Sequence, residues 1–166
     1  MRLELIMGLA LLASSPLAAH PEGAKAPAVQ AKPKHITDQA AVRSVLSHYK
    51  EAIEKLDARG TARLFTTDSA IFETGGVEGN YANYLVHHHL GPELGEFKSF
   101  RFSNYKIEVR FVGPVALANE SYTYRIETKK GEVAERIGVA TSVLTKIKGS
   151  WKILSMHNSG RRPKSS

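Results

Sequence analysis

The sequence contains no cysteine among its 166 residues. This absence excludes disulfide bonds and a cysteine nucleophile. The fold must therefore be stabilised by its hydrophobic core alone. A chain of this length is sufficient for one domain with such a core.

Two further absences narrow the chemistry that we expect. The sequence has no Gly-rich loop of the phosphate-binding type, and no serine with histidine and acidic partners at the spacing of a nucleophile motif. Nucleotide-dependent reactions and acyl transfer are therefore not expected. Long apolar runs are absent too, since Leu3–Leu12 is shorter than a membrane span and no other segment is long enough.

The first 19 residues have the pattern of a secretory signal peptide. Arg2 provides a positive charge, Leu3–Leu12 is short and mostly apolar, and Leu17-Ala18-Ala19 forms a small-residue cleavage site. We therefore expect a secreted protein, most simply one of a bacterial periplasm, with no membrane insertion after the signal is removed.

Residues 20–35 are rich in Ala, Pro and Lys and contain almost no large apolar side chain, which predicts a flexible linker. A single domain is expected over residues 36–160, followed by a basic tail over residues 161–166. Much of the net charge of +7 lies near these two ends. Nucleic acid is not expected as a partner, because the aromatic and basic interleaving of RNA-recognition motifs is missing.

The first half of the domain has mostly helical patterns. Apolar residues at three- and four-residue spacing predict a helix from Thr37 or Asp38 to about Asp57. A short helix over Thr61–Phe65 and a strand over Ser69–Glu73 follow. Asn80 is placed to cap a further helix, Tyr81–Leu90, which Gly91-Pro92 is expected to end.

The second half has four strand-like runs separated by turn sequences. The turns are Gly113-Pro114, Lys130-Gly131 and Lys148-Gly149. The predicted strands are Lys98–Val112, Val115–Thr128, Glu132–Ile147 and Trp151–His157. Strands of this length require a curved sheet. We therefore predict an α+β fold in which helices cover one face of an antiparallel sheet.

Two sequence patterns resemble a known group of proteins. The spacing Tyr49-x7-Asp57-x7-Phe65-x2-Asp68-x4-Glu73 is similar to that of ketosteroid isomerase, and the run G-x-W-K-I followed by H-x-S-x-R resembles SnoaL-related domains. Both belong to the nuclear transport factor 2-like superfamily. The resemblance covers residues 37–160 and implies a cone-shaped curved antiparallel sheet wrapped around the N-terminal helices. It also implies that Glu73 is a general base and Tyr49 an oxyanion-stabilising donor.

The last strand adds a third candidate for catalysis. Alternation along a strand directs Trp151, Ile153, Ser155 and His157 to one face, which predicts that His157 lies at the pocket. His89 and Tyr84 are expected to form a polar lining at the mouth of the same pocket.

Four more residues complete the predicted substrate-binding set. Three of them lie close together in the predicted strand Val115–Thr128, and the fourth is in the predicted basic tail. Tyr122 and Tyr124 share one strand face and Arg125 lies on the other, so either face can line the cavity; the alternative for the tyrosines is cross-strand packing. Arg125 and Arg161 are candidates for holding an anionic substrate. Their alternative is a surface salt bridge with Glu120, Glu127 or Glu135.

These observations give three hypotheses about function. The first is an enzyme or binder of a small hydrophobic or aromatic carbonyl compound that transfers protons without a cofactor or metal. The second is a non-catalytic ligand-binding module, or a homodimeric scaffold paired through Tyr122–Ile126 and Val139–Thr145. The third is metal binding by His88 or His89 with His157 and Glu73. Adjacent histidines diverge by about 100° on a helix, so they cannot bind one metal together.

Overall fold

The structure is a computed structural model that describes residues 34–164. The predicted signal peptide lies outside the described residues. So does the predicted linker, except for its last two residues, which form the start of the first helix. The last two residues of the predicted basic tail are also outside this range.

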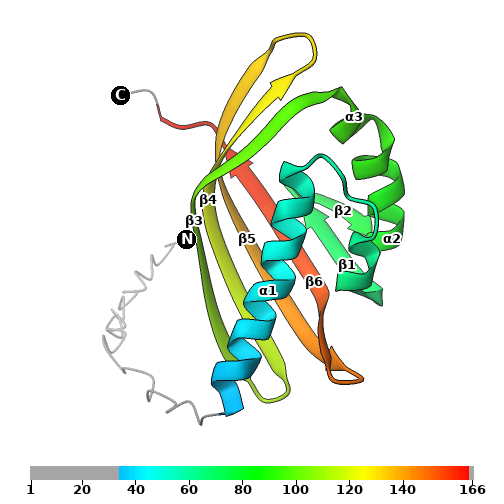
Figure 1. The fold of residues 1–166 in the computed structure, drawn as a ribbon, viewed down its shortest axis with the longest axis vertical. Coiled ribbons are helices and arrows are strands. Elements are labelled where there is room, and N and C mark those ends of the chain that lie inside the picture. Colours follow the sequence, from blue (N-terminus) through cyan, green and yellow to red (C-terminus); the bar gives the residue numbers. More distant parts are fainter. Residues whose placement is uncertain (1–33, 165–166) are drawn as a thin grey trace, which may run out of the picture. The chain divides into compact units, whose positions relative to one another are not determined.

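The predicted elements occur in the predicted order along the chain, and the short strand Gly76–Gly79 is an addition to them (Figure 1). The helical elements are α1 (Lys34–Glu54), the 3₁₀ helix η1 (Thr61–Leu64), α2 (Tyr81–Tyr84), the π-helical segment η2 (Leu85–Glu93) and α3 (Leu94–Glu96). The strands are β1 (Phe65–Glu73), β2 (Gly76–Gly79), β3 (Phe97–Val112), β4 (Val115–Thr128), β5 (Val133–Ile147) and β6 (Ser150–Arg161).

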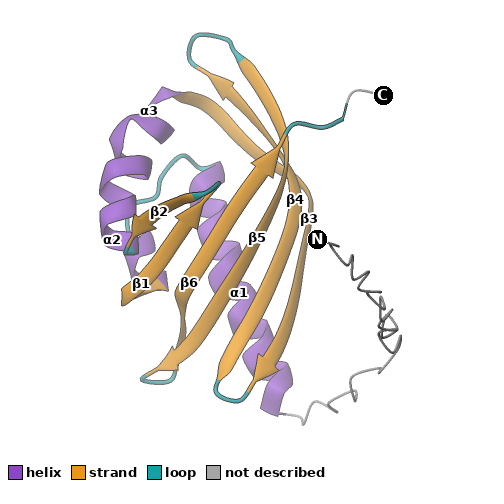
Figure 2. Ribbon diagram, turned by 180° about the vertical axis from the view of Figure 1, so that it is seen from behind, coloured by secondary structure: helices purple, strands orange, loops and turns teal. Residues whose placement is uncertain are grey.

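The six strands form one curved sheet in the order β2-β1-β6-β5-β4-β3 (Figure 2). Helix α1 crosses one face of this sheet, which confirms the predicted α+β class with the sheet curled around the N-terminal helix. Neighbouring strands are antiparallel, with the exception of β1 and β6, which run parallel. This pair arises because a long connection of helices and strands separates β1 from β6, and parallel neighbours need such a crossover.

Helix α1 holds the core against the sheet. Val42, Leu46 and Ile53 are buried at the helical spacing that the sequence predicts. The helix is shorter at its end than predicted, because Leu56 adopts a left-handed backbone conformation with a φ of 54°. At the opposite end of the sheet, the Trp151 indole donates a hydrogen bond to Asp38 of α1 at 2.9 Å.

The helix predicted over Tyr81–Leu90 continues further than expected. Asn80 caps it as predicted, since its side-chain oxygen accepts a hydrogen bond from the Asn83 amide at 2.9 Å. Gly91 breaks the helical backbone with a ψ of −147°, yet helical conformation resumes and lasts to Glu96. Glu93, beyond Gly91, therefore lies within hydrogen-bond distance of His89.

The register of β6 changes in the middle of the strand. Leu144 of β5 pairs with Ile153, and Val143 pairs with Ser155, so Leu154 is an extra residue. Such a bulge reverses the alternation of the residues that follow it. Met156 is consequently buried and His157 is exposed.

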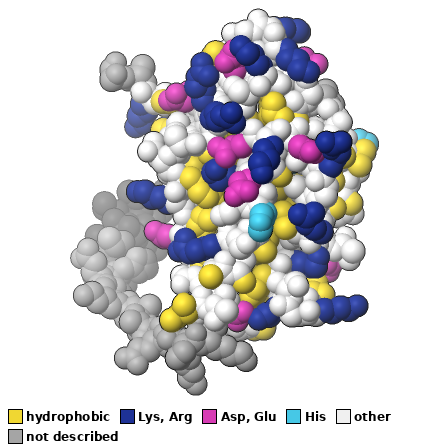
Figure 3. Space-filling view, in the orientation of Figure 1, with side chains coloured by type: hydrophobic (Ala, Val, Ile, Leu, Met, Phe, Trp, Pro, Cys, Tyr) yellow, Lys and Arg dark blue, Asp and Glu magenta, His cyan; other side chains and the backbone are white. Residues whose placement is uncertain are grey.

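The surface over α1 carries charges of both signs. Lys and Arg side chains are spread across this face with Asp and Glu between them (Figure 3). Within residues 34–164, no helix has the length and apolar character that a membrane span requires.

Candidate active site

A cavity lies between α1, the α2–η2–α3 segment and the inner face of the sheet. Its volume is about 140 Å³. An engineered apolar cavity of about 150 Å³ holds one benzene molecule, so this space suits a compound with a single ring. The lining residues are Tyr49, Ile53, Glu73, Thr74, Tyr84, His89, Glu93, Leu94, Phe100, Phe102, Tyr122, Tyr124, Ile126, Asn158, Ser159 and Gly160.

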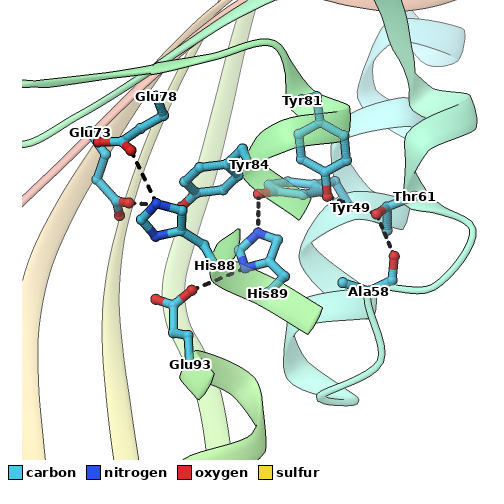
Figure 4. Close-up of polar contacts among 10 residues, drawn as sticks. All are labelled: Tyr49, Ala58, Thr61, Glu73, Glu78, Tyr81, Tyr84, His88, His89 and Glu93. Carbon is cyan, nitrogen blue, oxygen red and sulfur yellow. Dashed lines mark hydrogen bonds and ion pairs between the residues drawn. The ribbon is translucent and has the colours of Figure 1, made fainter. Parts of the chain in front are cut away.

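Glu73 is the carboxylate at the sheet side of the cavity. It is the last residue of β1, two residues after the buried Ile71, and it therefore faces the side of the sheet that α1 covers. Register with Asn158 of β6 fixes the end of the strand. The Tyr84 hydroxyl donates a hydrogen bond to Glu73 Oε2 at 2.8 Å (Figure 4). One carboxylate oxygen is thereby oriented by the protein.

Three side chains on the helical side form a hydrogen-bonded row. The Tyr49 hydroxyl lies 2.8 Å from His89 Nε2, and His89 Nδ1 lies 3.2 Å from Glu93 Oε2 (Figure 4). His89 is 7% exposed, so this row is shielded from solvent. The arrangement of carboxylate, imidazole and phenol is a path along which a proton can move.

The partners of His89 define two protonation states. The Glu93 carboxylate only accepts hydrogen bonds, so Nδ1 carries a proton. In neutral His89, Nε2 accepts from the Tyr49 hydroxyl. In the imidazolium, Nε2 donates to the Tyr49 oxygen, and the Tyr49 proton is then free to point into the cavity. Glu93 stabilises the positive charge of the second state.

The phenols of the cavity are neutral donors at ordinary pH. Burial, followed by the nearby Tyr81 and Tyr84 hydroxyls and the Glu73 carboxylate, raises the pKa of Tyr49 well above its usual value of 10. Burial and Glu73 also raise the pKa of Tyr84. Behind Tyr49, burial raises the pKa of Tyr81 to about 12, and its hydroxyl hydrogen-bonds to Thr61 at 2.7 Å.

Tyr122 and Tyr124 form the sheet wall of the cavity. Gly138 of the adjacent strand β5 and Gly160 of β6 allow the rings to lie close to the backbone. A Cβ added to Gly138 would lie 2.2 Å from the Tyr122 ring, and one added to Gly160 would lie 2.6 Å from the Tyr124 hydroxyl oxygen. These glycines therefore set the position of both rings.

Replacing Gly138 by Ala is expected to destabilise the protein by about 1–3 kcal/mol, because the added methyl group overpacks the wall and displaces Tyr122. Urea unfolding measures this change. Gly95→Ala is the control, since a Cβ there meets no atom within 4 Å. Equal stability of the two variants would show that the ring is not confined by the glycine.

Six of the nine predicted site residues line this cavity together, and three do not. The six are Tyr49, Glu73, Tyr84, His89, Tyr122 and Tyr124. The predicted placement of His157 at the pocket is wrong, because the bulge at Leu154 turns its side chain to the outer face, where 6.5 Å separates the centroids of its ring and the Phe72 ring. Arg125 and Arg161 are also exposed.

The two arginines contact other protein groups outside this cavity. Arg125 Nη1 lies 3.7 Å from Glu127 Oε2, which is one of the surface salt bridges considered as the alternative. Arg161 donates to the backbone oxygen of Arg162. Neither guanidinium lines the cavity.

One acidic member of the site was not predicted from the sequence. Glu93 follows the predicted end of the helix, but the helical conformation continues and brings it onto His89. The spacing of His89 and Glu93, four residues apart, was the available signal. Glu120 was considered only as a surface partner of arginine, although it is 7% exposed.

No cluster of three His, Asp or Glu side chains suited to a metal ion occurs among residues 34–164. The combination considered from the sequence is not assembled, since His157 lies on the outer face of the sheet. His88 instead pairs with Glu78, with 3.1 Å between its Nε2 and Glu78 Oε2.

Solved structures similar to this chain share its fold. A nuclear transport factor 2-like superfamily protein from Salmonella enterica serovar Typhimurium has a TM-score of 0.69 and 17% identity, covering 80% of this chain and 96% of its own. A ketosteroid isomerase-like protein from Erwinia carotovora atroseptica has a TM-score of 0.64 and 19% identity, covering 75% and 96%.

A third similar structure is an enzyme by its name. The LinA-type3 hexachlorocyclohexane dehydrochlorinase from Novosphingobium barchaimii has a TM-score of 0.67 and 15% identity, covering 80% of this chain and 90% of its own. No curated protein matches the sequence significantly. The model of the SnoaL-like domain family matches residues 42–162. The chain therefore belongs to the SnoaL-like domain family, and its fold is that of the nuclear transport factor 2-like superfamily.

Proposed function

We propose that the cavity binds a small one-ring carbonyl compound and catalyses proton transfer at the carbon next to the carbonyl group. The observation that carries this proposal is the pairing of two polar systems in one aromatic-walled cavity. Glu73 is held by Tyr84 on one side, and Tyr49 is linked to His89 and Glu93 on the other. A base and an acid that meet at one substrate are the requirement for isomerisation, dehydration and cyclisation.

Each residue has a defined part in the step. The Glu73 carboxylate removes a proton from the carbon, and the electron pair of the broken C–H bond forms the enolate. The Tyr49 hydroxyl donates a hydrogen bond to the carbonyl oxygen on which negative charge develops. When Nε2 of His89 donates to the Tyr49 oxygen, with Glu93 paired to Nδ1, it favours this donation. The proton on Glu73 then returns to another carbon of the product.

Two of the similar structures support proton transfer as the class of reaction. These are an isomerase-like protein and a dehydrochlorinase, and isomerisation through an enolate and loss of HCl both remove a proton from carbon. The small volume of the cavity favours a compound of one ring over a fused-ring steroid.

The test uses 3-cyclohexen-1-one, a one-ring ketone whose isomerisation to the conjugated 2-cyclohexen-1-one is followed by ultraviolet absorbance. We expect the protein to accelerate this reaction by about 100-fold or more over buffer. Saturable binding of the product enone without any acceleration would instead favour a non-catalytic binding module.

We propose further that the protein forms a homodimer through the outer face of the sheet. No helix of residues 34–164 covers this face (Figure 2). Val139 in the middle of β5 is 52% exposed there, and His157 of β6 is exposed on the same face. A sheet face that joins two copies would cover such side chains.

Val139→Lys is expected to convert a dimer to a monomer, because a lysine at the centre of a paired face would bury its charge. Sedimentation velocity of the protein measures the mass. Val133→Lys is the matched control, since Val133 is 54% exposed at the end of the same strand. A wild-type protein that stays monomeric at high concentration would contradict the proposal.

Export remains a further proposal, supported by the charged and apolar pattern of residues 1–19. Mass spectrometry of the protein recovered from a bacterial periplasmic fraction tests it. The expected mature protein begins at or near His20, and an intact first residue in that fraction would contradict cleavage.

A further inference from the structure

One buried carboxyl group, that of Glu120, has no part in the proposed proton transfer. Glu120 lies in the middle of β4 on the inner face of the sheet, opposite Ile107 of β3 and Ala140 of β5. It is 7% exposed. The Tyr105 hydroxyl donates a hydrogen bond to its Oε1. Its Oε2 is buried and has no hydrogen-bond partner among residues 34–164.

A bulge in β3 provides the contact to Oε1. The pairing of β3 with β4 shifts between Ser103 and Lys106, and Asn104 adopts a left-handed conformation with a φ of 52°. Asparagine tolerates this conformation better than most residues. Without the extra residue, alternation would direct Tyr105 outward. The bulge turns the Tyr105 ring to the inner face, beside Tyr122 at 5.8 Å between ring centroids.

A small hollow of about 30 Å³ lies beside Glu120 and adjoins the main cavity. This volume holds one water molecule or one oxygen substituent of a ligand. The two spaces share five lining residues, namely Tyr49, Ile53, Phe102, Tyr122 and Asn158. Of these two spaces, the main cavity is lined by Glu73 and His89 and the hollow by Glu120 and Tyr105. Polar groups therefore stand at two separate places along one aromatic-walled space.

We propose that Glu120 is a second ligand-anchoring residue, whose Oε2 forms a hydrogen bond with an additional oxygen substituent of the one-ring compound bound in the main cavity. This inference rests on the proposed function for the use of the cavity as a ligand site. It narrows the substrate class to ring compounds with two oxygen functions, of which one is the carbonyl group near Tyr49 and Glu73.

The direction of the hydrogen bond follows from the surroundings of the carboxyl group. Burial raises the pKa of Glu120, against the opposing effect of the Tyr105 hydroxyl, and so favours the neutral acid. In the neutral acid Oε1 accepts from Tyr105, and the proton resides on Oε2. Oε2 then donates to the ligand oxygen. A buried group of this kind costs stability when it is unpaired, so a ligand that pairs it gains affinity.

The experiment compares benzaldehyde with 3-hydroxybenzaldehyde and 4-hydroxybenzaldehyde by isothermal titration calorimetry. None of these has a removable hydrogen on a saturated carbon next to the carbonyl group, so binding is measured apart from turnover. We expect at least one hydroxylated probe to bind wild-type protein about 10-fold tighter than benzaldehyde, as one buried hydrogen bond allows.

Three variants assign that preference to Glu120. Glu120→Leu should reduce the affinity ratio to about 1, because it removes the polar group. Glu120→Gln should keep the ratio, because the amide accepts from Tyr105 and donates from its nitrogen, as the neutral acid does. Glu108→Leu, an exposed carboxylate on the outer side of β3, should also keep it.

The ratio of probe affinities for the wild-type protein is measured without any variant, so it can be obtained even if Glu120→Leu fails to fold. Equal affinity of all three probes for wild type, a ratio kept in Glu120→Leu, or a ratio lost in Glu120→Gln would each overturn the assignment. A wild-type protein that isomerises the ketone but binds all three aldehydes equally would overturn only this inference. A preserved ratio without isomerisation would overturn only the proposed proton transfer.

Discussion

Glu73→Gln is expected to lower the rate of 3-cyclohexen-1-one isomerisation by about 10²–10⁴-fold, which is the usual contribution of a positioned general base. Glutamine keeps the size of the side chain and can still accept a hydrogen bond from Tyr84. It cannot remove a proton from carbon. The fold and the affinity for the product enone should therefore change little, and the loss should appear in kcat.

The control for this result is another carboxylate on the same side of the molecule. Glu78 hydrogen-bonds to His88 and does not line the cavity. Glu78→Gln should leave the isomerisation rate unchanged. A Glu73→Gln variant that retains the parental rate would show that Glu73 is not the base.

Interruption of the row from Tyr49 to Glu93 is expected to have the second-largest effect. Tyr49→Phe removes the donor to the carbonyl oxygen, and we expect a loss of about 10²–10³-fold in kcat. His89→Leu breaks the link between Tyr49 and Glu93 and should cost a similar factor. Because these residues act as one unit, the double variant should be about as slow as either single variant.

Two neighbouring His–Glu pairs allow a matched comparison for the same row. His89 pairs with Glu93 inside the cavity, and His88 pairs with Glu78 outside it. Glu93→Gln should reduce kcat, whereas Glu78→Gln should not. Equal effects of the two changes, or losses in Tyr49→Phe and His89→Leu that multiply in the double variant, would contradict a shared proton path.

The positions of Tyr49 and Glu73 could be predicted because each depends on a regular element. Tyr49 lies on the buried stripe of α1 with Leu46 and Ile53, and a period of 3.6 residues fixes that stripe. Glu73 ends β1, whose pairing with β6 is regular from Ala70 to Glu73. Local periodicity and the family resemblance were sufficient for both residues.

Other parts of the site depend on irregularities that a periodic pattern does not contain. One extra residue at Leu154 reversed the orientation of His157, and one at Asn104–Tyr105 brought a phenol to Glu120. Glu93 reaches His89 because helical structure resumes after Gly91, where the Gly-Pro pair predicted an end. Bulges and helix breaks are set by tertiary packing, so they escape a prediction from local sequence.

The signal for Glu120 was nevertheless present in the sequence. Glu120, Tyr122 and Tyr124 are spaced two residues apart in β4, so they lie on the same face of the strand. A face that buries the two tyrosines therefore also buries this carboxyl group. A charged residue in a core-facing row is a departure from the pattern, and such departures are often found at functional sites.

Exchange of the hydrogens next to the carbonyl group of cyclohexanone with solvent deuterium tests the central claim most directly. Proton NMR in D₂O follows this exchange whether or not a later reaction step occurs. We predict that the wild-type protein accelerates it by about 100-fold or more over buffer, and that Glu73→Gln returns it to the buffer rate. Exchange at the buffer rate with cyclohexanone bound to the wild-type protein would contradict a proton-transfer site in this cavity.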